Sequence, residues 1–174
     1  DHVSELGARN LQLARALEMN KTLLESLAAS ESLMRIAGDL VALGGWQYYV
    51  GEDRFSYSEK VAEIHEVPID FEPTLEEVIE FCAPEYRRRI RKVFKNCLKK
   101  GDPFDEEVLI VTGSGRRVWV RTVGTPIRDE AGRVTRIHGA FQDISGRKKA
   151  EEALRQGASQ FRAFVEGAPD GIFV

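Results

Sequence analysis

The stretch from Asp143 to Glu151 sets the end of a strand directly against the start of a helix, and it constrains the fold more than any other feature. Ser145 can serve as an N-cap, because its hydroxyl can accept a hydrogen bond from a free backbone N–H of the first helical turn. Ala150, Glu151 and the residues that follow are strong helix formers. The stretch contains no catalytic residue, so it predicts an exit from a domain and not an active site.

The residues before this exit predict the order strand, strand, three helices, and then three strands. Alternating apolar residues and turn residues indicate strands over residues 46–50, 54–57, 105–112, 117–127 and 134–142. Ser58 and Thr74 are expected to begin two short helices, and Pro84 to open a longer one that Gly101 ends. This mixture of segregated strands and helices predicts an α+β domain.

Over residues 30–151 the chain resembles the PAS sensory domains of the PAS/PAC type. Its exit, Asp-Ile-Ser-x-Arg-Lys-x-Ala-Glu, is similar to the Asp-Ile-Thr-x-Arg-Lys-x-x-Glu signature that closes those domains. The later strands carry residues usual in the family, namely Glu107, Gly115, Trp119, Val120, Gly132 and Gly139. The sequence departs from the family at Leu109 and at residues 82–85. The resemblance implies a PAS fold, in which a five-stranded antiparallel sheet carries helices on one face.

The segment before this domain, residues 1–29, carries an apolar heptad repeat. Its two series are Val3, Asn10, Leu17 and Leu24, and Leu6, Leu13, Asn20 and Leu27. Such a seam favours a dimeric coiled coil in which the Asn residues set the register, and a lone amphipathic helix packed on its own domain is the alternative. A further helix is expected to restart at Ser30 or Ser32 and to stop at Gly44-Gly45.

A long-range repeat predicts a second domain of the same kind. The segment from Ser32 to Gly45-Trp46 returns near the end of the chain, beginning at Ser159, about 126 residues later. We therefore expect a first PAS domain over residues 30–145, a signalling helix over residues 146–166, and the start of a second PAS domain over residues 167–174. The chain begins without Met and ends inside an apolar run, so we expect it to be a piece of a longer protein.

Aromatic residues at positions that face the helices and the sheet are candidates for the lining of a pocket. They are Tyr48, Tyr57, Phe94, Trp119 and Phe141, and His138 is one of the few titratable groups on the central strands. A pocket with this lining is expected to hold a small apolar or organic, uncharged ligand, or to be empty. The alternative is that all of these residues are ordinary core.

The sequence has few of the residues that would bind haem, a covalent flavin or a metal ion. Residues 74–100 contain no His that could serve as an axial ligand, which indicates against haem. Cys97 follows an Asn, as in flavin photosensors, but the next residues differ and Phe141 stands where those relatives have Gln, which indicates against a covalent flavin. His65 has no second His at helical spacing, so we interpret it as a helix end and expect no metal site.

Charge and composition bound the partners of the chain. The net charge of −3 offers no overall attraction to nucleic acid or to an acidic membrane surface. The basic run within residues 87–100 lies opposite the apolar stripe of its helix, so we interpret it as a solvated face. No apolar run approaches the roughly 20 residues that a membrane span needs. Cys82 and Cys97 form no C-x-x-C pair. We expect a cytoplasmic domain with reduced cysteines, no nucleic acid and no membrane contact.

The resemblance implies a signalling role for a chain that is not itself an enzyme. It implies the sensory module of a sensor histidine kinase of a two-component system. A diguanylate cyclase or a cyclic-dinucleotide phosphodiesterase is the alternative output, and a ligand-free dimerisation scaffold is a third possibility. A scaffold predicts a core filled by side chains, whereas a sensor predicts a void.

The signal is expected to leave through the exit stretch. Asp143 and Arg147 lie close enough in sequence to form a charge-assisted bond that ties strand to helix. Capping by Ser145, with Asp143 merely favouring the positive end of the helix dipole, is the competing explanation. We expect the functional unit to be a homodimer.

Overall fold

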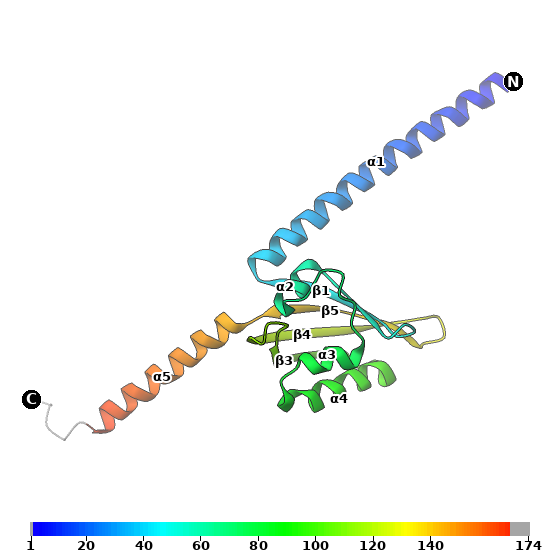
Figure 1. Ribbon diagram of the computed structural model, residues 1–174. Coiled ribbons are helices and arrows are strands. Elements are labelled where there is room, and N and C mark those ends of the chain that lie inside the picture. Colours follow the sequence, from blue (N-terminus) through cyan, green and yellow to red (C-terminus); the bar gives the residue numbers. More distant parts are fainter. Residues whose placement is uncertain (1, 168–174) are drawn as a thin grey trace, which may run out of the picture. The chain divides into compact units, whose positions relative to one another are not determined.

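The computed structural model describes residues 2–167, in which strands and helices follow one another in the predicted order (Figure 1). Helix α1 spans His2–Leu40 and precedes strands β1 (Leu43–Tyr49) and β2 (Arg54–Tyr57). Helices α2 (Glu59–His65), α3 (Leu75–Phe81) and α4 (Pro84–Lys100) follow. Strands β3 (Phe104–Val111), β4 (Arg117–Arg128) and β5 (Val134–Asp143) then lead to helix α5 (Ser145–Gly167). The strand and helix bounds agree with the sequence predictions to within a few residues, apart from those of α1 and the start of β1.

The five strands form one antiparallel sheet in the order β2-β1-β5-β4-β3. The first strand, β1, and the last, β5, are therefore neighbours, and Leu43 at the start of β1 lies opposite Gln142 at the end of β5. Helices α2, α3 and α4 supply buried residues to the core beside this sheet. The predicted α+β fold with a five-stranded antiparallel sheet is confirmed.

Helices α2, α3 and α4 begin at the predicted residues, and α4 also ends at its predicted glycine. The Ser58 hydroxyl accepts a hydrogen bond at the start of α2. Thr74 and Glu77 form a reciprocal capping box at the start of α3, in which each side chain bonds the other's backbone N–H. Pro84 opens α4, and Gly101 closes it with a φ of 76°. Local sequence alone is therefore sufficient to place the starts of these three helices and the end of α4.

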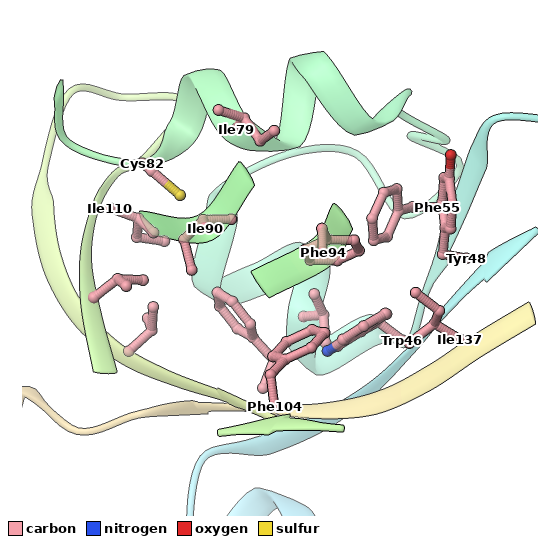
Figure 2. Close-up of a cluster of buried hydrophobic side chains, with 14 of the residues drawn as sticks. Trp46, Tyr48, Phe55, Ile79, Cys82, Ile90, Phe94, Phe104, Ile110 and Ile137 are labelled. Carbon is pink, nitrogen blue, oxygen red and sulfur yellow. The ribbon is translucent and has the colours of Figure 1, made fainter. Parts of the chain in front are cut away.

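The core lies between one face of the sheet and the helices, and aromatic rings dominate it (Figure 2). Phe94 of α4 stands at its centre. The centroid of its ring lies 5.9 Å from that of Trp46, 5.8 Å from that of Phe55 and 5.0 Å from that of Phe104. These separations are in the range that aromatic pairs prefer. One side chain of α4 therefore packs against rings from β1, β2 and β3.

Two predictions for the start of the domain are wrong. Helix α1 is continuous through Ser30 and Ser32, where the sequence predicts a restart. Gly44 and Gly45 lie inside β1 instead of ending a helix. The reason for Gly44 is packing, since a Cβ atom there would lie 2.8 Å from the backbone nitrogen of Val61. Glycine at this position allows α2 to approach β1 closely.

Helix α1 forms a unit separate from the one that begins at Val41, whereas the sequence places the domain boundary at residue 30. Apolar side chains at the described heptad positions are more than half exposed, and these are Leu6, Leu13, Leu17, Leu24 and Leu27. Residues 168–174, which hold most of the predicted start of a second domain, lie outside the described residues. Between residues 2 and 167, no helix combines the length and the apolar character needed to cross a membrane.

Candidate functional site

A small cavity lies inside the core, with a volume of about 30 Å³. Its lining comes from both the helices and the sheet, and consists of Trp46, Phe55, Tyr57, Val61, His65, Val78, Cys82, Ile90, Phe94, Val108, Ile110, Thr122 and Phe141. Pockets for drug-sized ligands have volumes of about 300–1,000 Å³. A single water molecule needs about 10–15 Å³. The cavity therefore has room for two or three atoms of the size of oxygen, and side chains fill most of the core.

Three of the six predicted pocket residues line this cavity, namely Tyr57, Phe94 and Phe141. Tyr48 is buried close by in the same core. Its hydroxyl donates a hydrogen bond to Asp53 Oδ1 at 2.8 Å, so its polar end is bound to the β1–β2 turn and not to the cavity. Tyr48 is therefore a structural residue.

Trp119 and His138, the other two predicted pocket residues, do not line this cavity. Side chains alternate between the two faces of a strand, and the neighbours of Trp119, Val118 and Val120, are buried on the core face. Trp119 therefore faces away from the core. His138 is exposed, next to the buried Ile137 of the same strand.

His65 is the titratable residue that does line the cavity, and only 2% of its surface is exposed. Its ring is stacked between Tyr57, at 5.1 Å, and Phe141, at 4.6 Å between centroids. Burial lowers the pKa of His65 from 6.5 to about 4, so the imidazole is neutral at pH 7. His65 ends α2, as predicted. The sequence also contains an indication that His65 is buried, because His65 follows Val61 by four residues and therefore lies on the apolar face of α2.

The end of α2 is bound to the hairpin between β3 and β4. The backbone N–H of Gly113 donates to His65 O at 2.8 Å. Glu66, whose φ is 56°, accepts a hydrogen bond from Arg116 Nε at 2.9 Å and another from the Ser114 hydroxyl. Hydrogen bonds from the hairpin hydroxyls, first that of Ser114, lower the pKa of Glu66 to about 2. The backbone of His65, whose imidazole lines the cavity, is therefore bound to this hairpin.

The predicted bond between Asp143 and Arg147 is not formed. Asp143 Oδ1 accepts from Ser145 N at 2.8 Å, which holds the start of α5. Arg147 instead places one nitrogen 2.5 Å from Glu107 Oε1 on β3 and another 2.5 Å from Glu151 Oε1 on its own helix. The charged partner on the sheet is therefore Glu107, and Asp143 acts on the backbone at the helix start.

Further bonds attach the first turn of α5 to the sheet. Lys148 Nζ lies 2.7 Å from Glu107 Oε2 and 4.9 Å from the ring centroid of Trp119. The Lys148 bond is the main cause that lowers the pKa of Glu107. Ile144 N donates to Trp119 O at 2.8 Å, and the Ser145 hydroxyl accepts from Trp119 N at 3.1 Å. Ser145 therefore bonds β4 in place of the helical N–H predicted for it.

Both cysteines are free and buried, as expected. Burial raises the pKa of the Cys82 thiol and of the Cys97 thiol to about 11. Across the described part of the chain, no three His, Cys, Asp or Glu side chains come together in a group that could hold a metal ion.

Known proteins similar to this chain include one named a probable diguanylate cyclase and one named a sensor protein. The chain is 26% identical over 161 residues to the probable diguanylate cyclase DgcE of Escherichia coli, a match that covers 92% of the chain and 14% of DgcE. It is 32% identical over 91 residues to the sensor protein FixL of Bradyrhizobium diazoefficiens, a match that covers 52% of the chain and 18% of FixL. The chain thus spans a small part of each relative.

Solved structures and a family model agree with the observed fold. The structure of a sensory box histidine kinase/response regulator from Burkholderia thailandensis is 27% identical, with a TM-score of 0.59, and the match covers 74% of this chain and 97% of that one. The N-terminal domain of a diguanylate cyclase with PAS/PAC sensor from Marinobacter aquaeolei, at 18% identity and a TM-score of 0.57, shares the fold; that match covers 61% of this chain and 98% of the other. A family model described as PAS fold matches residues 54–141, half of the chain. The chain therefore belongs to the PAS family.

Proposed function

We propose that this chain is the sensory input module of a larger signal-transduction protein whose output is a sensor histidine kinase of a two-component system. The solved structure named a sensory box histidine kinase/response regulator supports this output, and the relative named sensor protein FixL supports the sensory role. In this proposal the module is not itself an enzyme. It acts in the cytoplasm, and it contacts neither membrane nor nucleic acid.

A diguanylate cyclase, or a phosphodiesterase for the same kind of cyclic dinucleotide, is the second candidate output. The observation that favours it is the length of the match to DgcE, 161 residues, which exceeds the sheet and its helices and reaches into the flanking helices. Under either output we propose that residues 167–174 begin a second PAS domain, because of the repeat between Ser32 and Ser159.

The observation that carries the proposed role is the attachment of α5 to the sheet through Glu107. Glu107 and Val108 are consecutive residues of β3, so they face opposite sides of the sheet. Val108 lines the cavity, and Glu107 contacts Arg147 and Lys148 of α5. A change in the cavity that displaces β3 therefore also displaces the carboxylate that holds the first turn of α5.

We expect Glu107→Gln and Arg147→Gln to abolish the response of the full-length protein to its stimulus and to leave the domain folded. Both side chains are more than a third exposed, and surface ion pairs contribute only about 0–1 kcal/mol to stability. The measurements are output activity with and without stimulus, and thermal unfolding of each variant. Arg155→Gln is the matched control, because Arg155 pairs with Glu152 on the same helix without touching the sheet.

Asp143→Ala and Ser145→Ala separate backbone attachment from ion pairing. If these two variants lose the response while Glu107→Gln and Arg147→Gln keep it, the ion pairs have no part in signalling and the helix start alone passes the signal. A normal response in all four variants would contradict the proposal that α5 is the exit for the signal.

We further propose that the module works as a homodimer joined through α1. The exposed leucines of α1 recur at heptad spacing, which is typical of coiled-coil seams. Light scattering is expected to give twice the chain mass for residues 1–174 and the chain mass after removal of residues 1–28. A monomer at high concentration in both samples would contradict the dimer. A dimer in both would move the interface to the domain, as the ligand-free scaffold alternative requires.

A further inference from the structure

We propose that the cavity beside His65 is a binding site for a neutral hydrogen-bond donor of up to about three non-hydrogen atoms, held by His65 Nε2. This inference rests on the proposed sensory function and adds the chemical class of ligand. It starts from the volume of about 30 Å³, which leaves no room for an aromatic or larger metabolite.

The tautomer of His65 follows from its one hydrogen bond. Nδ1 lies 2.9 Å from the backbone oxygen of Val61. A carbonyl oxygen can only accept, so Nδ1 carries the hydrogen. The ring is neutral at pH 7 because of its burial, and therefore Nε2 has a free lone pair. Among the described residues, no group donates to Nε2. The ring thus offers one acceptor without a partner in a side chain that is 98% buried.

The arrangement of the rings leaves the edge of His65 for the cavity. Tyr57 and Phe141 stack on its faces, and Phe81 packs at right angles to it with a centroid separation of 5.2 Å, so the part of the ring that can meet the void is the edge that Phe81 leaves open. Thr122 is a second polar residue in the lining and is 8% exposed. Its hydroxyl has no hydrogen-bond partner among the described residues, and it lies opposite Phe141 in the register of β4 and β5. The imidazole of His65 and the hydroxyl of Thr122 therefore belong to largely buried residues, line the same small void, and have a polar atom without a partner among the described residues.

The rest of the lining decides the charge of the ligand. Apart from Tyr57, Cys82, His65 and Thr122 it is apolar, and none of the lining residues carries a full charge at pH 7. An ion would lose its hydration without gaining an opposite charge, which is costly, whereas a neutral O–H or N–H group would gain the acceptor of His65. A short alcohol, a simple amine in its neutral form or water has the required chemistry.

Hydrogen bonds connect the binding site at His65 to the β3–β4 hairpin of the sheet. The carbonyl of His65 accepts from Gly113 N, and Glu66 is held by the β3–β4 hairpin. A molecule bound to the imidazole edge therefore acts on the same residue whose backbone is bonded to the hairpin that joins β3 to β4. β3 in turn carries Glu107, the partner of α5.

The test uses methanol as the probe, with the ¹⁵N resonances of the histidine side chains recorded on the 174-residue chain. We expect the Nε2 resonance of His65 to move saturably as methanol is added, and that of the exposed His138 to move only in proportion to the solvent. Xenon, which fits a small void but donates no hydrogen bond, and tert-butanol, which is too large, are expected to leave the His65 Nε2 resonance unchanged. The backbone amide resonances of the lining residues Val61 and Thr122 report binding when the imidazole is absent: they should shift saturably with methanol in the wild type and not in His65→Phe, which keeps an aromatic ring between Tyr57 and Phe141.

Three results would overturn the site. The first is a His65 Nε2 resonance that methanol shifts no differently from that of His138. The second is an equal, saturable shift with xenon, which would mean a dry apolar void without a role for the acceptor. The third is saturable binding that persists in a folded His65→Phe variant. None of these depends on output activity, so failure of the site is distinguishable from failure of the sensory role, which the Glu107 and Arg147 variants test.

Discussion

Replacing Gly139 with alanine is expected to destabilise the domain by about 3 kcal/mol or more, and to leave little folded protein at 37 °C if the domain has the usual marginal stability. A Cβ atom at this position would lie 1.9 Å from Val123 O and 2.5 Å from Trp46 Cζ2. Val123 belongs to β4, which pairs with β5, so its carbonyl cannot rotate away without breaking the ladder. The clash is therefore with backbone at the centre of the sheet.

Gly45→Ala is the matched control for this substitution. Gly45 lies on β1, the interior strand that pairs with β5, and its added Cβ would meet only Gly139 O, at 3.9 Å. We expect a change of less than about 1 kcal/mol, because alanine is at least as favourable as glycine in a strand. Urea unfolding followed by circular dichroism gives both free energies. Equal effects of the two substitutions would mean that the close approach at Gly139 does not exist.

Acidification from pH 6.5 to pH 4 is expected to reduce the free energy of unfolding by about 3 kcal/mol through His65 alone. The folded-state pKa of His65 is about 4, below the ordinary 6.5, so in this range the unfolded chain binds the proton that the folded chain refuses. The stability is fully present above pH 6.5 and is lost as the pH falls through the folded pKa. Glu66, with a pKa lowered to about 2, loses its contribution only below pH 4.5.

The measurement is urea unfolding of the wild type and of His65→Phe at several pH values. The difference between their free energies is expected to vary between pH 6.5 and pH 4 and to be constant above pH 7. Carboxylates shared by the two proteins cancel in this difference. A constant difference over the whole range would mean that the imidazole is not buried in its neutral form.

Local signals explain why most of the fold could be predicted. Thr74 and Glu77 form a capping box three residues apart, and Pro84 and Gly101 delimit α4, so the chain itself specifies these ends. The prediction that Gly44 ends a helix is wrong because the need for glycine at this position is not local. The residue that requires glycine there, Val61, is 17 positions later and approaches only after α2 has packed against β1.

The site was less predictable, because it depends on which side of a strand faces inward and on distant partners. Trp119 is large enough to line a pocket, but its neighbours Val118 and Val120 are buried on the core face of β4. Because side chains alternate along a strand, Trp119 faces the opposite side of the sheet. Arg147 has an acidic residue four positions before it, yet it pairs with Glu107, 40 positions away. Only the packing of α5 against the folded sheet brings this pair together.

The pairing of β1 with β5 has a consequence for how such proteins evolve. Leu43 and Gln142 lie opposite each other, and paired residues of antiparallel strands have Cα atoms only about 4.5–5.5 Å apart. The chain thus enters and leaves the sheet at almost the same point. When the two ends of a domain lie side by side, the domain can be inserted, duplicated or deleted within a longer protein. The segments before and after it then remain close together in space. The same geometry makes this module suitable for transplantation between unrelated regulatory proteins.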